Sequence, residues 1–244
     1  MRLSIVVPII ASLLLLIAGS SPGSLQSEDG ASPATGGAQE LLALASDRLA
    51  DTQTVRFHLE IEGDTFIDDA GTLRLVQARG DLARPDMVDV EFQVELLGTQ
   101  TVSIRMITIG EESWTTDLIS GEWGPSPEEF GYDPTVLFDN QNGLGPVAGR
   151  LQNPTVEGQE EVGNRNAWKV VGTVDESVIE PMTSGTIKGD EITITLWLDV
   201  ETNDMLRLQV EEPEDLDKDN PATWTMTLTD HDADVTIERP DLNE

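Results

Sequence analysis

The two histidines are the only imidazole side chains in the chain, and they decide whether serine-type hydrolysis is available. A nucleophilic serine needs an adjacent base, most often histidine. His58 lies between Phe57 and Leu59, on the polar-facing phase of a predicted strand, and His231 lies in an Asp-His-Asp turn. Neither position has a recognisable catalytic context, so we interpret both histidines as solvated or structural.

One acidic segment has the opening of a calcium-binding loop. Asp215, Asp217 and Asp219 stand at alternate positions, as the first three ligands of such a loop do. The sixth position is then Asn220 where glycine is needed, and the twelfth is Met226 where a bidentate glutamate is needed. Because 46 acidic residues produce such spacings by chance, we predict no metal site.

The remaining motifs of catalysis are also missing from the sequence. The absence of cysteine excludes disulfides, thiol catalysis and thiolate metal sites. The sequence has no phosphate-binding glycine loop, dinucleotide fingerprint or zinc spacing. With so many carboxylates, a pair of them carries no argument for a glycosidase. We therefore predict no cofactor, and no motif in the sequence indicates a catalytic site.

The net charge of −32 restricts the partners of the protein. Such a surface repels nucleic acid and anionic lipid headgroups, so neither is expected as a direct electrostatic partner. Two interpretations of the charge stay open: adaptation to a saline medium, where about 1 M salt screens repulsion within a few ångströms, and ordinary acidic solubility.

Alternation of apolar and polar residues is the strongest structural signal. From Val88 to Glu95 every even position is apolar and every odd position is polar, so a strand there has one apolar face. The same period recurs at Val55, Phe57, Leu59 and Ile61, at Ile192, Ile194, Leu196 and Leu198, and at Trp224, Met226 and Leu228. The pattern predicts a large antiparallel sheet with one apolar face.

The N-terminal part predicts export. Residues 1–20 combine a positive charge with an apolar run that is shorter than the ~20 residues of a membrane span. A cleaved signal peptide and an uncleaved N-terminal anchor both stay open. Residues 21–38 are rich in Ser, Gly and Pro and predict a flexible linker. Residues 39–244 predict one folded domain.

The order of elements in that domain follows from periodicity and turn residues. An amphipathic helix is expected at 39–50, and a hairpin is expected between Trp114 and Trp123 around Ser120-Gly121. Strands are expected at 54–62, 72–78, 86–97, 101–109, 168–174, 191–200, 205–211, 222–229 and 235–238, with turns at 63–64, 80–81 and 98. Short helices are expected at 135–139, after Asp133-Pro134, and at 146–151, with 143–145 as a mobile elbow between them.

A sheet of this size must curl or close, because strands twist and an open apolar face aggregates. The predicted fold class is therefore α+β, mainly β: a curved antiparallel sheet of about ten strands, with short helices covering its concave face. Three short helices leave that concavity incompletely filled.

Several segments, in order, resemble the LppX/LprA/LprF/LprG envelope lipoproteins of mycobacteria and their relatives. The order and spacing of these segments extend over almost the whole mature chain. The segments are 54–57 (TVRF), 80–86 (GDLARPD), Trp123, 132–134 (YDP), 143–144 (GL), 196–199 (LWLD) and 235–240 (VTIERP).

The resemblance implies a half-barrel similar to the lipoprotein-localisation factors, and a carrier without enzymatic activity. Members of the family hold acylated glycolipids or triacylglycerol-like lipids between the sheet and the helices. Carried onto this chain, the expected lipid-binding residues are Phe57, Leu59, Ile61, Val90, Phe92, Val94, Ile104, Met106, Leu137, Leu144 and Leu151.

The sequence departs from the family at its lipid anchor. The family usually has a cysteine that receives a diacylglyceryl group, whereas residues 16–19 are followed here by Ser20. No thioether lipid forms without that cysteine. We expect an exported protein of the cell envelope or the medium, either free or tethered by an uncleaved signal.

The resemblance thus implies binding and transport of an acylated lipid or glycolipid by a monomer, with a membrane exporter as a further partner. Two rival functions stay open. One is an envelope adaptor whose apolar sheet face is filled and whose ligand is a protein. The other is a hydrolase that uses acidic pairs in a polar cleft.

Overall fold

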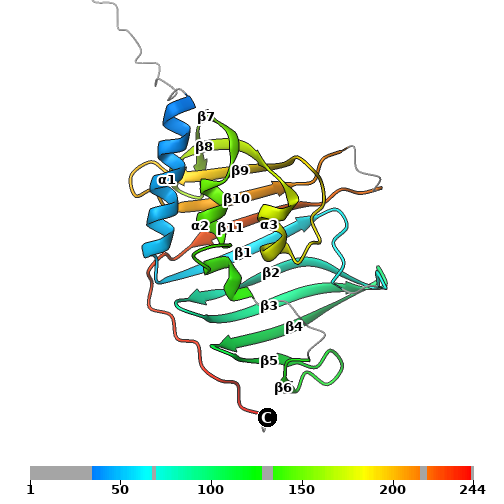
Figure 1. Ribbon diagram of the computed structural model, residues 1–244. Coiled ribbons are helices and arrows are strands. Elements are labelled where there is room, and N and C mark those ends of the chain that lie inside the picture. The colour runs from blue at the N-terminus through cyan, green and yellow to red at the C-terminus, as the bar shows by residue number, and fades with distance from the viewer. Residues whose placement is uncertain (1–34, 68–69, 128–133, 215–218, 243–244) are drawn as a thin grey trace, which may run out of the picture. The chain divides into compact units, whose positions relative to one another are not determined.

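One antiparallel sheet of eleven strands forms the frame of the described domain (Figure 1). The computed structural model describes residues 35–67, 70–127, 134–214 and 219–242. Across the sheet the order is β6-β5-β4-β3-β2-β1-β11-β10-β9-β8-β7, so the sheet is open and β6 and β7 are its edges. The bounds are β1 Thr54–Glu62, β2 Leu73–Ala83, β3 Met87–Leu96, β4 Gln100–Ile109, β5 Glu112–Thr116, β6 Trp123–Pro125, β7 Gln152–Val162, β8 Arg165–Val174, β9 Ile192–Asp199, β10 Met205–Glu211 and β11 Thr223–Thr229.

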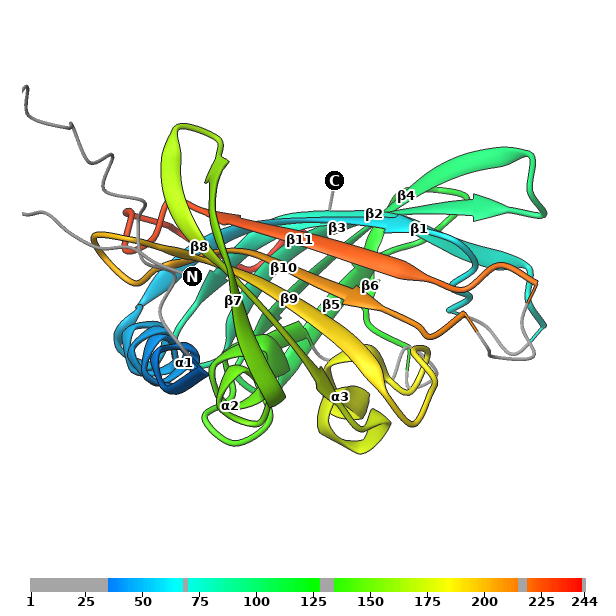
Figure 2. The same cartoon turned by 90° about the horizontal axis from the view of Figure 1, so that it is seen from above.

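The helices lie on the concave side of this sheet. Figure 2 shows α1, α2 and α3 together on one side of the curved strands. Their bounds are α1 Thr35–Asp51, α2 Leu144–Gly149 and α3 Glu176–Thr183, with a short 3₁₀ helix, η1, at Pro134–Phe138. The predicted class, mainly β with short helices over a curved sheet, is confirmed.

The alternation in sequence corresponds to the two faces of the sheet. In β1 the residues Val55, Phe57, Leu59 and Ile61 are buried, and the residues between them are exposed. Antiparallel pairing places Phe57 opposite Leu228 of β11. The apolar positions of neighbouring strands therefore share the concave face and form one core with the helices.

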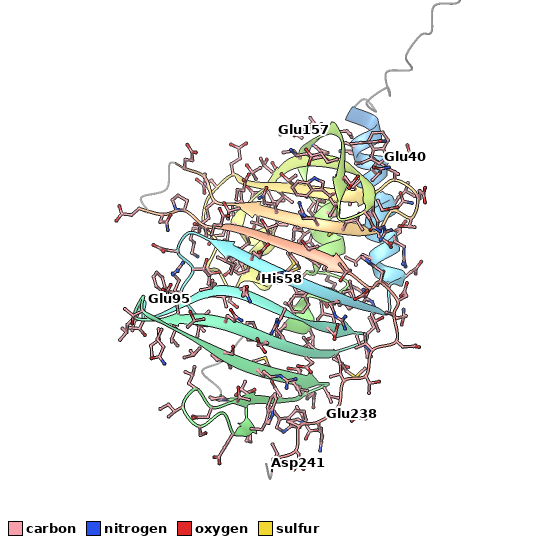
Figure 3. All side chains as sticks on the ribbon, turned by 180° about the vertical axis from the view of Figure 1, so that it is seen from behind. Glu40, His58, Glu95, Glu157, Glu238 and Asp241 are labelled. Carbon is pink, nitrogen blue, oxygen red and sulfur yellow. The ribbon has the colours of Figure 1, made fainter. Side chains whose placement is uncertain are left out.

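The opposite, convex face carries charged and polar side chains, as Figure 3 shows. His58 lies in the middle of this face and is exposed, as its place in the alternation predicts. The hairpin predicted around Ser120-Gly121 is also confirmed, since Thr116 of β5 pairs with Trp123 of β6.

α1 begins at Thr35, four residues before the expected start of the helix. The residues at the end of the expected linker 21–38 therefore belong to the helix. The rest of that linker and the expected signal or anchor at 1–20 lie outside the described residues. In α1 the buried residues Ala38, Leu42, Ala45 and Leu49 form one stripe against the core.

The expected turn at Gly80-Asp81 is wrong, because both residues lie inside β2. Gly80 allows close contact with β3 rather than a change of direction. A Cβ built on Gly80 would lie 2.1 Å from the carbonyl oxygen of Asp89 and 2.8 Å from the Cα of Val90. The chain turns only after Ala83, at residues 84–86.

The expected elbow at 143–145 is also wrong, because Leu144 and Gly145 form the first turn of α2. A Cβ on Gly143 would lie 2.5 to 2.8 Å from the carbonyl oxygens of Asp139, Leu137 and Val136. Gly143 is thus packed tightly against the end of η1. The helix expected at 146–151 begins two residues earlier and ends at Gly149. Pro134 begins η1 as expected, whereas Asp133 lies outside the described residues.

Two elements were not predicted. β7 is mostly exposed along its length, so it lacks the alternation that marks a half-buried strand. α3 buries Ile179, Met182 and Thr183, at the spacing of one helix face. Pro181 inside α3 interrupts the helical signal in the sequence.

The strand expected at 235–238 is not part of the sheet. This segment is extended, with Val235 and Ile237 half-buried and Thr236 and Glu238 exposed. It continues to Arg239, whose guanidinium carbon lies 5.0 Å from the ring centroid of Trp114. The alternation here reflects packing of the C-terminal segment without strand pairing.

Candidate functional site

An apolar pocket of about 460 Å³ lies between the concave face of the sheet and the helices. Strands β1, β2, β3, β10 and β11 supply one wall, and η1, α2 and α3 supply the other. The lining residues are Phe57, Leu59, Leu75, Ala78, Val90, Phe92, Leu208, Val210, Trp224 and Met226 from the sheet, Pro134, Leu137, Leu144, Ile179, Met182 and Thr183 from the helices, and Thr65, Phe66, Ile67, Ser184 and Thr186 from loops.

The pocket opens between the β1–β2 loop and the end of α3. Among its lining residues, Phe66, Ile67 and Ser184 are exposed, and the others are buried or half-buried. Thr65 is held in place because its Oγ1 accepts a hydrogen bond from the indole nitrogen of Trp224 at 3.0 Å. Phe66 and Ile67 supply the apolar part of the rim of this opening, next to Thr65.

The lining offers almost no polar chemistry. None of the lining residues is ionisable. The hydroxyl of Thr183 donates to the carbonyl oxygen of Ile179 at 3.1 Å, and that of Thr186 donates to the carbonyl oxygen of Thr183 at 2.6 Å. These hydroxyls are satisfied within the protein, so the pocket favours a hydrocarbon ligand.

All eleven predicted lipid-binding residues are buried in the main core. Those that line the pocket are Phe57, Leu59, Val90, Phe92, Leu137 and Leu144. Those that do not line it are Ile61, Val94, Ile104, Met106 and Leu151. Alternation identifies the face of the sheet, but the helices determine which part of that face stays uncovered.

Sequence reasoning missed the part of the pocket that α3 and the β1–β2 loop form. Ile179 and Met182 project from α3, and Phe66 and Ile67 come from the loop. The spacing of three between Ile179 and Met182, after Asp175-Glu176, was the available signal for a helix. Leu208 and Val210 of β10 were missed as lining residues although their strand was predicted.

A second, polar pocket of about 270 Å³ lies between α1, the end of η1 and the end of β2. Arg84 lines it and donates to the carbonyl oxygens of Thr52 at 2.8 Å, Phe138 at 2.7 Å and Leu49 at 3.1 Å. Burial lowers the pKa of the Arg84 guanidinium from its ordinary value. This arginine joins α1 and η1 to the sheet.

A network of ion pairs joins α1 to strands β8 to β10. The buried carboxylate of Asp204 accepts hydrogen bonds from Arg48 at 2.7 Å and from Arg165 at 2.8 Å. Arg165 also donates to Asp199 at 2.8 Å. Burial would raise the pKa of Asp204, but hydrogen bonds from Arg165 and Thr202 keep it below its usual range.

His231 lies beside this network and has a structural role. Its Nε2 lies 3.1 Å from the carbonyl oxygen of Met205. Burial lowers the pKa of His231, although the neighbouring Asp204 acts in the opposite direction. No serine hydroxyl is hydrogen-bonded to this ring in the described part of the chain.

The described residues contain no group of three or more His, Asp or Glu side chains that could hold a metal ion. The calcium-like segment at 215–220 lies partly outside them. Among the helices that the structure describes, none has the length and hydropathy needed to cross a membrane.

Comparisons with known proteins agree with this fold. The sequence profile of the LppX_LprAFG lipoprotein family matches residues 37–237. The crystal structure of LprF from Mycobacterium bovis covers 86% of this chain and 99% of its own, with a TM-score of 0.68 and 23% identity. LppX from Mycobacterium tuberculosis covers 83% of this chain and 99% of its own, with a TM-score of 0.58 and 13% identity.

Two curated relatives carry names that describe a cargo. LprF of Mycobacterium bovis, assigned provisionally to diacylated glycolipid transport, is 36% identical over 123 residues, which are 47% of this chain and 44% of LprF. The match thus spans less than half of the relative's length. The lipoarabinomannan carrier protein LprG of Mycolicibacterium smegmatis is 23% identical over 238 residues, 95% of this chain and 93% of LprG. With a profile match over most of its length and this fold, the chain belongs to the LppX_LprAFG lipoprotein family.

Proposed function

We propose that the protein binds the acyl part of a lipid or glycolipid in the apolar pocket and carries it within the cell envelope, without catalysing a reaction. The observation that carries the proposal is a pocket of about 460 Å³ with no ionisable lining residue. The names of the relatives LprF and LprG support a lipid cargo. A monomeric state and a membrane exporter as a further partner are part of the proposal.

The volume of the pocket fits the proposed cargo. A methylene group occupies about the space of one water molecule, roughly 30 Å³, so a pocket of about 460 Å³ holds on the order of fifteen methylene groups. That is the size of one acyl chain. Burial of each methylene group is worth ~0.8 kcal/mol, or ~12 kcal/mol for such a chain before the cost of ordering it.

The two rival functions fit the structure less well. An adaptor with a filled sheet face would leave no apolar space over the concave side, where the pocket lies. A hydrolase with paired carboxylates needs them in the cleft, but all the pocket-lining residues are non-ionisable.

Native lipid extraction tests the proposal. The full chain is purified from its native host, and organic extracts are analysed by mass spectrometry beside extracts of an unrelated acidic secreted protein. We expect an acylated lipid near one equivalent per chain, and binding of a fluorescent fatty acid in vesicle-free solution that this lipid competes away. A chain that is free of lipid and does not bind the fatty acid would refute the carrier function.

A further inference from the structure

Most exposed large hydrophobic side chains gather at one end of the sheet. Among the described residues there are seven such side chains, and five of them lie at this end. We call these five the apolar tips: Phe66 and Ile67 in the β1–β2 loop, Leu97 in the β3–β4 turn, and Leu118 and Ile119 in the β5–β6 turn. Leu44 on α1 and Leu242 near the C-terminus are the other two.

The register of the strands places the three loops together. Phe66 pairs with Arg74, Arg74 with Glu95, and Glu95 with Thr101, so the first two loops lie side by side. Met106 pairs with Thr115, so β5 runs back toward the same end before its turn. In Figure 1 all three loops lie at the right-hand end of the sheet.

Leu97, the apolar tip in the β3–β4 turn, lowers the stability of the folded protein. Leu97 has a φ of 51° and is followed by Gly98 with a φ of 68°, in a turn closed by the Thr99 N–H and the Leu96 carbonyl oxygen at 3.1 Å. Asn-Gly is the sequence that favours such a turn, because a bulky residue is strained at positive φ. Leu97 is also 69% exposed. A strained and exposed leucine points to a role outside the fold.

The tip in the β5–β6 turn is held outward by an ordered turn. The carboxylate of Asp117 accepts the backbone N–H of Ile119 at 2.9 Å and that of Ser120 at 2.8 Å. The Gly121 N–H donates to the Asp117 carbonyl oxygen at 2.9 Å. Ile119 therefore projects from a hydrogen-bonded turn, and the residue is 97% exposed.

The pocket opens at this end, since Phe66 and Ile67 belong both to its rim and to the apolar tips. We infer that the apolar tips dock the protein on an uncharged or zwitterionic lipid surface, with the mouth of the pocket facing that surface. This inference rests on the proposed function in one respect, which is the reason for docking: the transfer of lipid. The exposure of the apolar tips does not depend on that function. Apolar side chains on separate turns suit shallow insertion among lipid headgroups.

The charge of the protein determines which lipid surface fits. The net charge of −32 repels an anionic membrane, and carboxylates such as Glu62 and Glu122 are exposed beside the tips. Attraction must therefore come from apolar insertion, which an uncharged or zwitterionic surface permits. The docking is expected to be weak and reversible, as a carrier requires.

Single-cysteine labelling tests the docking, because the natural chain has no cysteine. The full-length variants Leu97→Cys, Ile119→Cys and Leu44→Cys each carry an environment-sensitive fluorophore and are mixed with phosphatidylcholine vesicles. We expect a several-fold rise in emission at 97 and 119 and none at 44, which is an equally apolar site on α1. The readout is local, so association through another segment does not produce this pattern.

The composition of the vesicles gives a second comparison. Mixing in an equal part of phosphatidylglycerol should abolish the rise at low salt, and high salt should restore it. Unchanged emission at 97 and 119 with phosphatidylcholine, or an equal rise at all three positions, would overturn the docking surface. Unchanged emission would instead assign the tips to contact with a protein.

Leu97→Asn separates docking from lipid binding. Asparagine tolerates positive φ, so this variant should be more stable to heat than the natural chain and yet transfer lipid to vesicles several-fold more slowly. Its binding of a soluble fatty acid should be unchanged. If no variant binds the fatty acid but labelled tips still respond to vesicles, the proposed function fails and the docking stands. Unchanged transfer by Leu97→Asn would contradict the docking role.

Discussion

The guanidinium carbon of Arg84 lies 4.6 Å from the ring centroid of Phe138. The same guanidinium donates to the carbonyl oxygens of Leu49 and Thr52, where α1 ends. One side chain at the end of β2 thus stacks on η1 and caps α1. The position of these two helices determines how much of the concave face stays uncovered. Arg84 therefore supports the apolar pocket, although it lines only the second, polar pocket.

Replacing Arg84 should therefore cost much more stability than replacing an arginine on the convex face. We expect Arg84→Met to lower the free energy of unfolding by about 2–4 kcal/mol, because part-buried carbonyl groups lose their donors. Arg79→Met in β2 is the control, since Arg79 is exposed and pairs with Glu91. Its cost should stay below about 1 kcal/mol. Urea unfolding followed by circular dichroism measures both, and equal losses would contradict the role of Arg84.

Gly143 should not tolerate a side chain, whereas Gly149 at the other end of α2 should. Gly143→Ala places a methyl group against three carbonyl oxygens and is expected to destabilise the protein by about 1–3 kcal/mol. A Cβ on Gly149 meets no atom within 4 Å, so Gly149→Ala should gain up to about 1 kcal/mol of helix propensity. Thermal unfolding distinguishes the two variants. A neutral Gly143→Ala would show that the loop before α2 adapts.

Filling the pocket should block ligand binding. Val90 lines the pocket, and Val90→Trp adds an indole there, so affinity for a fluorescent fatty acid should fall by at least tenfold or about 1.4 kcal/mol. Asp89→Ala is the matched control, because Asp89 faces the convex side and pairs with Arg105 at 3.0 Å. Equal effects of the two variants would refute the assignment of the faces.

A variant that enlarges the pocket keeps this test informative if Val90→Trp does not fold. Phe92→Ala removes a ring from the lining and should shift the preference toward longer acyl chains. Titration with fatty acids of increasing length measures the shift. An unchanged length preference would contradict the assignment of Phe92 to the lining.

The Asp204 network should make stability depend on pH in the acid range. The pKa of Asp204 is lowered in the folded state, and that of an aspartate in an unfolded chain is about 3.9. The stabilisation from the ionised Asp204 is therefore present above about pH 4–5 and is lost as the pH falls through the folded-state pKa. Asp204→Asn should reduce the dependence of the unfolding free energy on pH between pH 5 and 3. It should also lower that free energy by about 3–5 kcal/mol at pH 7. Glu91→Gln, which removes an ion pair with the exposed Arg79, should cost less than about 1 kcal/mol at pH 7. If Asp204→Asn and the natural chain showed the same dependence of stability on pH, the Asp204 network would be excluded as the cause of that dependence.

His231 should make the stability of the protein depend on pH in a second, higher range of pH. Burial lowers its pKa in the folded state, so near the ordinary value of about 6.5 the unfolded chain binds more protons and acidification favours unfolding. Stability is therefore expected to fall between pH 7.5 and 5.5. The facing charges are Asp204, Arg165 and Arg48. His231→Gln should remove this dependence of stability on pH, and an unchanged dependence would contradict the role of His231.

The sequence predicted the face of the sheet better than the pocket. Val90 and Phe92 could be assigned to the concave side because alternation depends only on local geometry. Which of the apolar positions stay uncovered depends on η1, α2 and α3, and these elements are short and weakly patterned. Ile104 and Met106 were predicted to bind lipid, and they are buried in the main core without lining the pocket.

Contacts between distant parts of the chain explain the other errors. Gly80 indicates a turn in isolation, and only the approach of Asp89 shows why glycine stands within a strand. β7 needs no apolar alternation because it lies at the edge and is mostly exposed. Arg84 belongs to a segment singled out for its resemblance to the family, but its contacts with Leu49 and Phe138 require the folded chain.

An open sheet has two edges at which a second chain could add a strand and start a fibre. Here β6 has only three residues and ends in Pro125, which has no N–H to donate. β7 carries Glu157, Glu160 and Glu161, so two copies meeting at that edge would bring like charges together. The half-barrel can therefore stay open without polymerising, because β6 is too short and β7 too negatively charged to pair readily with a second chain.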